Sequence, residues 1–189
     1  MIPASELRKG QVIRHEGARC KVVAADYHVG GGKSGGMVHA KLRDLASGHV
    51  SEHRFASHDK VEDLDVHRET MDFLYLAGDE CCFMNPATFE QVSLPKANLG
   101  PLVPYLAEGM KVQVEFLEGE PLSVDIPPHA DVTVVSTAPG IRGEGMDNTL
   151  KPATIVGGLD VLVPQFVKEG DRIRVEIETG KYLERLQKH

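Results

Sequence analysis

Met37-Val38-His39-Ala40-Lys41-Leu42 is followed by the turn Ser47-Gly48 and by Val50-Ser51-Glu52-His53-Arg54-Phe55, and these segments are the clearest indication of the fold class. In the first segment Val38, Ala40 and Leu42 alternate with Met37, His39 and Lys41. A two-residue period is typical of a strand with one buried face, because neighbouring strand side chains point to opposite sides. Two such runs joined by a glycine turn predict an antiparallel hairpin.

The same pattern recurs along the chain, whereas helical periodicity is nearly absent. Alternating runs are found at residues 71–75, 112–116, 122–126 and 173–177, and turns such as Glu118-Gly119-Glu120 separate them. Short helices are expected only at Leu99–Glu108 and at Pro86–Gln91. We therefore predict an all-β chain of small antiparallel barrels, since closure of a barrel removes exposed sheet edges.

Two breaks predict three domains of similar size. The charged stretch Val61-Glu62-Asp63-Leu64-Asp65 and the proline-marked joint Ile126-Pro127-Pro128-His129 divide the chain into residues 1–64, 65–127 and 128–189. Each piece is small for an independent core, so we expect the pieces to support one another at their interfaces.

Composition excludes several classes of protein. The 189 residues are 41% hydrophobic and 26% charged, without an apolar run long enough to span a membrane or a signal-peptide pattern, so a cytoplasmic protein is expected. The three cysteines, Cys20, Cys81 and Cys82, have no metal or disulfide spacing, and we interpret them as buried thiols. No metal and no cofactor are expected.

Charge is distributed unevenly over the three pieces. The net charge is −7, but residues 1–64 carry 10 Lys and Arg against 8 Asp and Glu, whereas residues 65–127 carry 3 against 11. Contact with phosphate needs basic residues, so an RNA contact is plausible for the first piece and disfavoured for the middle one.

The most unusual segment is Gly30-Gly31-Gly32-Lys33-Ser34-Gly35-Gly36, which surrounds Lys33 with five glycines. A Walker phosphate loop would need glycine at Tyr27 and a helix afterwards, and neither is found. A Schiff-base lysine would need a dry site. Two interpretations remain: an idle flexible tip, or a slim arm that carries a cation into a narrow site and leaves the amine open to a modifying enzyme.

Three segments resemble the elongation factor P family of bacteria, and the resemblance covers essentially the whole chain. They are Lys33 on its glycine tip followed by Lys41-Leu42-Arg43; Phe83-Met84-Asn85 with Thr88-Phe89-Glu90-Gln91; and Thr137–Gly143 leading into Lys151-Pro152-Ala153-Thr154, Gly158, Val161, Val163-Pro164, Val167 and Gly170. We expect the valines of the last segment in a core and its two later glycines in turns.

The resemblance implies an SH3-like (KOW-type) N-terminal barrel followed by two OB-like β-barrels in an elongated, tRNA-like shape. It implies a non-enzymatic monomer that binds both ribosomal subunits between the peptidyl and exit sites and relieves stalling at consecutive prolines. Lys33 would contact the CCA end of the peptidyl-tRNA, supported by Gly30, Gly31, Gly32, Ser34, Gly35 and Gly36, and in many members the matching lysine is covalently extended by a modifying enzyme. RNA contacts are expected at Lys41, Arg43, Arg142 and Lys151.

This chain departs from the family pattern at three places. Gly31 stands where many members have proline, Ser34 stands where glycine is common, and the loop 143–150 is more acidic than a loop that approaches the exit-site codon in some members. The alternatives left open are an RNA-binding OB module with an incidental loop, and a diverged paralogue that serves other messages.

Overall fold

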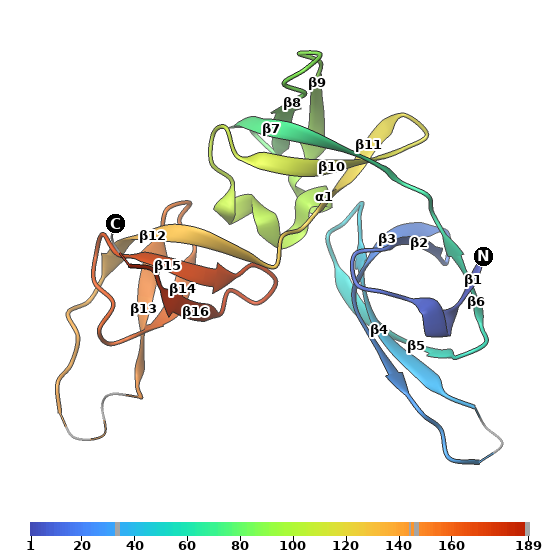
Figure 1. The fold of residues 1–189 in the computed structure, drawn as a ribbon, viewed down its shortest axis with the longest axis horizontal. Coiled ribbons are helices and arrows are strands. Elements are labelled where there is room, and N and C mark those ends of the chain that lie inside the picture. The colour runs from blue at the N-terminus through green and yellow to red at the C-terminus, as the bar shows by residue number, and fades with distance from the viewer. Residues whose placement is uncertain (33–34, 144, 146–147, 188–189) are drawn as a thin grey trace. The chain divides into compact units, whose positions relative to one another are not determined.

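The computed structural model describes residues 1–32, 35–143, 145 and 148–187, and these form three antiparallel sheets (Figure 1). We call them the first, middle and C-terminal sheets. Helix is limited to short segments, and no helix in the described part is long and apolar enough to cross a bilayer. The prediction of an all-β chain is confirmed.

The first sheet has six strands in the order β1-β6-β2-β3-β4-β5. The strands are β1 (Ile2–Pro3), β2 (Val12–His15), β3 (Ala18–His28), β4 (Met37–Asp44), β5 (Val50–Ala56) and β6 (Lys60–Asp63), with the 3-10 helix η1 (Ala4–Glu6) after β1. Exposed and buried residues alternate along β4, as its sequence predicts, and Val38, Ala40 and Leu42 enter the core. Their alternation therefore sets which face of the hairpin is free.

The middle sheet has five strands in the order β11-β10-β7-β8-β9. They are β7 (His67–Ala77), β8 (Glu80–Met84), β9 (Gln91–Pro95), β10 (Lys111–Leu117) and β11 (Glu120–Asp125). The helix expected at Leu99–Glu108 is found as two short pieces, α1 (Lys96–Leu99) and the 3-10 helix η3 (Gly100–Tyr105), the second of which contains Pro104.

The helix expected at Pro86–Gln91 is wrong. Residues 86–88 form a turn, and Gln91 already begins β9. The side-chain oxygen of Asn85 accepts hydrogen bonds from the backbone N–H of Ala87 (2.9 Å) and Thr88 (3.3 Å), so the turn is closed locally rather than continued as a helix.

The C-terminal sheet has five strands in the order β14-β13-β12-β15-β16. They are β12 (His129–Thr137), β13 (Leu150–Ile155), β14 (Asp160–Pro164), β15 (Arg172–Glu176) and β16 (Tyr182–Arg185). As predicted, Val161, Val163 and Val167 are buried, and Gly158 and Gly170 lie in turns with φ of +84° and +88°. The family-like segment is therefore mostly a folding signature.

The chain packs as two compact units. One contains residues 1–100 and 107–125, and the other contains residues 101–106 and 126–189. The first and middle sheets thus share one unit, while the short segment at 101–106 packs with the C-terminal sheet. The domain boundaries at 64/65 and 127/128 stay predictions.

Candidate functional site

The glycine-rich loop is carried by the longest hairpin of the first sheet, formed by β3 and β4 (Figure 1). The two strands pair from Cys20↔Asp44 to His28↔Met37, with an irregularity between Val22 and Ala24. Lys33 and Ser34 lie outside the described residues. The described pairing of the two strands ends at His28↔Met37, so the role expected for Lys33 stays a prediction.

Backbone packing requires glycine at one position of this loop, Gly30, and the Tyr27 side chain lies close to a second, Gly36. A Cβ at Gly30 would lie 1.8 Å from the carbonyl oxygen of Gly35, and a Cβ at Gly36 would lie 2.2 Å from the hydroxyl of Tyr27. Gly32 and Gly35 have φ of +82° and +66°, in the region that favours glycine. Glycine therefore allows the two sides of the β3–β4 hairpin to approach closely, which keeps the arm slim.

The outer face of this hairpin and of β5 carries a polar groove of about 480 Å³. Asp26, His28, His39, Lys41 and Arg54 line it together with Ala24, Ala40, Glu52 and His53. The His28 and His39 rings lie 4.6 Å apart, and Lys41 is 3.5 Å from the Glu52 carboxylate. Mixed charge on this face gives it weak net attraction for phosphate.

Of the four basic residues expected at RNA, the structure leaves two on the surface and buries two. Lys41 and Arg142 are exposed. Lys151 is only 6% exposed, and its ammonium donates a hydrogen bond to the carbonyl of Ala138. Arg43 is 5% exposed, and its guanidinium lies so close to Gly100 that a Cβ there would be 2.8 Å from Cζ.

Burial gives Lys151 and Arg43 packing roles that the sequence did not predict, because a phosphate cannot reach a side chain enclosed in this way. Of these four residues, Lys41 and Arg142 are kept as proposed RNA contacts, because the burial of Arg43 and Lys151 does not suit that role.

Sequence reasoning missed a buried charged pair between the first and middle sheets, formed by Lys21 of β3 and Glu115 of β10. Burial lowers the pKa of the Lys21 ammonium, and the neighbouring Glu115 carboxylate acts in the opposite direction. The only signal in the sequence is a lysine directly before the apolar run Val22–Ala25, which is too common to identify a partner 94 residues away.

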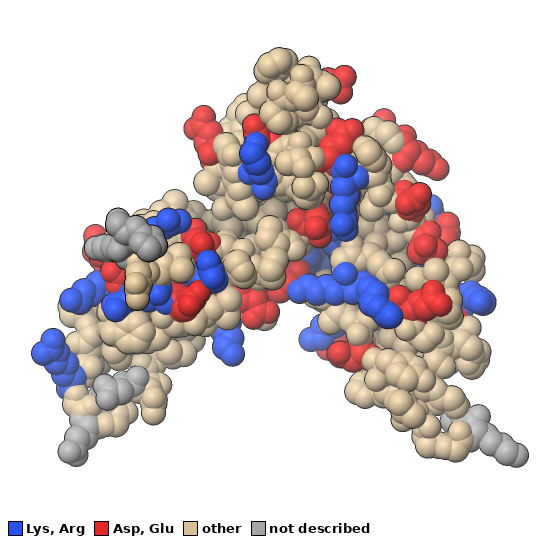
Figure 2. Space-filling model, in the orientation of Figure 1, with Lys and Arg blue, Asp and Glu red and all other residues tan. Residues whose placement is uncertain are grey.

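The middle sheet offers a poor surface for RNA. Figure 2 shows acidic side chains spread over this part of the molecule, in line with the 11 Asp and Glu against 3 Lys and Arg of residues 65–127. A pocket of about 490 Å³ there is lined by Asp65, Glu69, Glu90 and Glu118. Within the described ranges, no three His, Cys, Asp or Glu side chains come together as a metal site would require.

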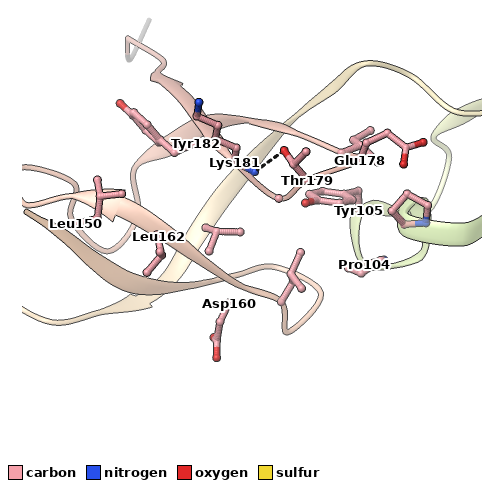
Figure 3. Close-up of a pocket in the computed structure, with 14 residues that line it drawn as sticks. Pro104, Tyr105, Leu150, Asp160, Leu162, Glu178, Thr179, Lys181 and Tyr182 are labelled. Carbon is pink, nitrogen blue, oxygen red and sulfur yellow. Dashed lines mark hydrogen bonds between the residues drawn. The ribbon is translucent and has the colours of Figure 1, made fainter. Parts of the chain in front are cut away.

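A larger groove of about 670 Å³ lies within the C-terminal unit (Figure 3). Apolar side chains that include Pro104, Leu150 and Leu162 form much of its wall, and the backbone N–H of Lys181 donates to Thr179 Oγ1 at 3.2 Å beside it. Tyr105 lines the groove, and its buried hydroxyl has no hydrogen-bond partner among the described residues. An apolar wall does not suit RNA phosphate, so this groove is separate from the expected RNA contacts.

Comparison with known proteins gives matches along nearly the whole chain. Residues 3–61 match the family described as "Elongation factor P (EF-P) KOW-like domain", residues 66–124 match "Elongation factor P (EF-P) OB domain", and residues 130–185 match "Elongation factor P, C-terminal". The prediction of a KOW-type first domain followed by OB-type barrels is confirmed.

Two curated relatives are similar over their full length. An elongation factor P of Acidobacterium capsulatum is 39% identical over 97% of this chain and 98% of its own. One of Gemmatimonas aurantiaca is 36% identical over 96% of both. Among solved structures, a eukaryotic translation initiation factor 5A from Methanococcus jannaschii aligns with a TM-score of 0.45 and 19% identity, over 65% of this chain and 92% of that one.

Proposed function

This chain belongs to the elongation factor P family of translation factors, and from that premise we propose that it binds the ribosome between the peptidyl and exit sites and stimulates peptide-bond formation at consecutive prolines. In this proposal Lys33 contacts the CCA end of the peptidyl-tRNA.

The observation that carries the proposal is the construction of the arm. β3 and β4 are paired up to His28↔Met37, and beyond them a Cβ at Gly30 would lie 1.8 Å from the backbone oxygen of Gly35. An idle surface loop has no need of such slimness. A slim arm with a lysine at its end suits a narrow, phosphate-rich site, where an ammonium makes charge-assisted hydrogen bonds.

Positioning explains how a protein without catalytic groups could accelerate the reaction. Proline has a fixed φ and a constrained amide, so its reactive groups are poorly oriented. Orientation of reactants accounts for a large part of many barriers. A contact that stabilises the correct arrangement by about 1.4 kcal/mol gives roughly a tenfold rate increase. The ribosome carries out the chemistry in this account, and the protein acts as a non-enzymatic monomer in the cytoplasm.

Covalent extension of Lys33 by a modifying enzyme would add reach to the same contact. The proposed additional RNA contacts are Lys41, on the outer face of the arm, and Arg142, in the loop between β12 and β13. The two residues lie in different units, so each is tested separately.

The test is synthesis through a Pro-Pro-Pro codon run in a reconstituted bacterial translation system, with protein from its native source. We expect the wild-type protein to restore synthesis and Lys33→Ala to be at least about tenfold less active. Lys60→Ala should be as active as the wild-type protein. Lys60 is the matched control because it is an exposed lysine of the same sheet, away from the loop.

Two results would contradict the proposal. Equal activity of the Lys33 variant would make the loop incidental, and salt-sensitive binding to free RNA would then favour a plain RNA-binding module. Ribosome binding without any restored synthesis would favour a paralogue that serves other messages.

A further inference from the structure

Lys21 connects two sheets of the same compact unit. It lies on β3, is 4% exposed, and extends its ammonium from the first sheet into the middle sheet. There it donates hydrogen bonds to Oε1 of Glu115 and to the carbonyl oxygen of Val124, the latter at 2.6 Å. The two acceptors belong to β10 and β11, so both of these hydrogen bonds cross between the sheets.

The acceptor is itself held rigidly by its own sheet. Glu115 is fully buried, and its Oε1 also accepts a hydrogen bond from Ser123 Oγ at 2.7 Å. Its Oε2 accepts one from Arg68 Nε at 3.0 Å. Because Arg68 and Ser123 also bond the two carboxylate oxygens, Glu115 offers Lys21 an acceptor of defined direction rather than a loose ion pair.

Apolar side chains from both sheets also pack together. Val12 and Leu45 of the first sheet region cluster with Leu122 of β11, and Leu64, Val66 and Leu117 pack against them. The first-sheet region also approaches the segment after β9 at two further points, where Gly48 lies close to Ala97 and Arg43 lies close to Gly100. Apolar packing excludes water but has little directional preference, whereas the hydrogen bonds of Lys21 favour one orientation of the two sheets.

Energetics favour an orienting role over a stabilising one. Buried ion pairs often add little net stability compared with apolar residues of the same volume, because desolvation offsets their attraction. Apolar residues of the same volume would hold the two sheets together equally well without the desolvation cost. The costly polar arrangement is therefore best explained by the geometry that it imposes.

We propose that Lys21 is a positioning residue that fixes the direction of the β3–β4 arm relative to the middle sheet. Lys21 and the arm share one strand, since β3 runs from Ala18 to His28 and ends next to the glycine loop. A rotation of β3 about its base would be carried along the strand to the loop. The consequence for translation rests on the function proposed for Lys33, whereas the fixed orientation does not.

The first experiment compares Lys21→Met with Lys111→Met by residual dipolar couplings on this 20.6 kDa chain. Lys111 is the matched control, because its ammonium bonds Asp72 at 3.0 Å within the middle sheet and the pair is more exposed. We expect one alignment tensor to fit the first and middle sheets in the unmodified protein and in Lys111→Met, and two tensors of unequal magnitude in Lys21→Met. A single shared tensor in Lys21→Met would overturn the proposal.

A second variant separates orientation from stability. Lys21→Met, Glu115→Leu and Ser123→Ala together replace the network by apolar groups, which is expected to restore much of any thermal stability that Lys21→Met loses. We expect this triple variant to keep two unequal tensors and to be about tenfold less active than the unmodified protein in Pro-Pro-Pro synthesis. Recovery of both the shared tensor and full activity would show that the network only stabilises, and would overturn the proposal.

Failure of the proposed function is distinguishable from failure of this inference. If the unmodified protein does not restore synthesis, the function proposed for Lys33 fails, while the tensors still decide whether Lys21 fixes the two sheets. If Lys21→Met does not fold, the triple variant supplies the same comparison.

Discussion

Gly157→Ala is expected to detach the segment at residues 101–106 from the C-terminal sheet. Gly157 lies in the turn between β13 and β14, where the backbone N–H of Gly158 donates to the carbonyl of Ile155 at 3.0 Å. The turn contacts the main chain of Pro104: a Cβ at Gly157 would lie 2.0 Å from the Pro104 carbonyl oxygen and 3.1 Å from its carbonyl carbon. Because the obstacle is backbone, no side-chain rotation can relieve the clash.

The size of the effect follows from two contributions. Gly157 has φ of +106°, and an L-residue in the left-handed region costs about 1–2 kcal/mol. Real Cβ contacts essentially never fall below 3.0 Å, so the turn or the Pro104 segment must move by at least the missing 1.0 Å. Overpacking of this kind costs about 1–3 kcal/mol. Together the substitution should lower the free energy of unfolding by about 2–5 kcal/mol, a large part of the stability of a small domain.

Gly158→Ala is the matched control, because Gly158 has φ of +84° and a Cβ there would meet nothing within 4 Å. It should cost only the backbone strain of about 1–2 kcal/mol. Calorimetry and guanidinium unfolding measure both variants, and hydrogen exchange reports on the amides of residues 101–106. We expect faster exchange there only in Gly157→Ala. Equal losses in the two variants, with unchanged exchange, would refute the role given to the Pro104 contact.

Three further substitutions or treatments test local features. The backbone N–H groups of Ser47 and Ala46 donate to the Asp44 carboxylate and hold its pKa below the usual 3.8. The ionised carboxylate therefore stabilises the fold above about pH 4, and this contribution is lost as the pH falls through the lowered pKa. Asp44→Ala should therefore lower the stability by about 1 kcal/mol at pH 7, and melting curves of variant and unmodified protein should converge toward pH 2; a gap that persists in acid would refute the assignment. Burial raises the pKa of Cys81 to about 11, so Ellman's reagent at pH 8 should not react with this thiol in the native protein but should react with it in guanidinium. Rapid labelling of Cys81 in the native protein, located by mass spectrometry, would contradict its burial. Phe89 is 71% exposed with φ of +61°, so Phe89→Gly should raise stability by up to about 1 kcal/mol while Phe89→Ala should not, and a loss in the glycine variant would mean that the ring packs on the protein.

Local periodicity explains why so much of the fold could be predicted from the sequence. The alternation in Met37–Leu42 is read directly as exposed and buried positions on β4, because the strand period of two depends only on neighbouring residues. The turn at Glu118-Gly119 was also predicted from local sequence, and its two residues have φ of +52° and +83°. Such signals need no knowledge of distant parts of the chain.

Prediction failed where a side chain competes with the backbone for hydrogen bonds. Pro86–Gln91 was expected as a short helix, but Asn85 closes a turn there with its side-chain oxygen. Asn and Asp favour turns for this reason, and a six-residue segment has too little helical periodicity to oppose them. The strand β9 then begins at Gln91, inside the predicted helix.

The candidate site was predicted only as far as the loop itself, because the role of a basic residue depends on acceptors far away in the sequence. Lys21 meets Glu115 across 94 positions, and Lys151 meets the carbonyl of Ala138 across 13. Nothing local distinguishes these lysines from exposed Lys41. The positive balance of residues 1–64 therefore overstates the charge available to RNA, since Lys21 and Arg43 are enclosed and Lys41 lies beside Glu52. Because Lys21 and Arg43 are enclosed, a specific contact at the end of the arm would add to general attraction to phosphate in the proposed ribosome binding, and such a contact would depend on the direction in which the arm is held.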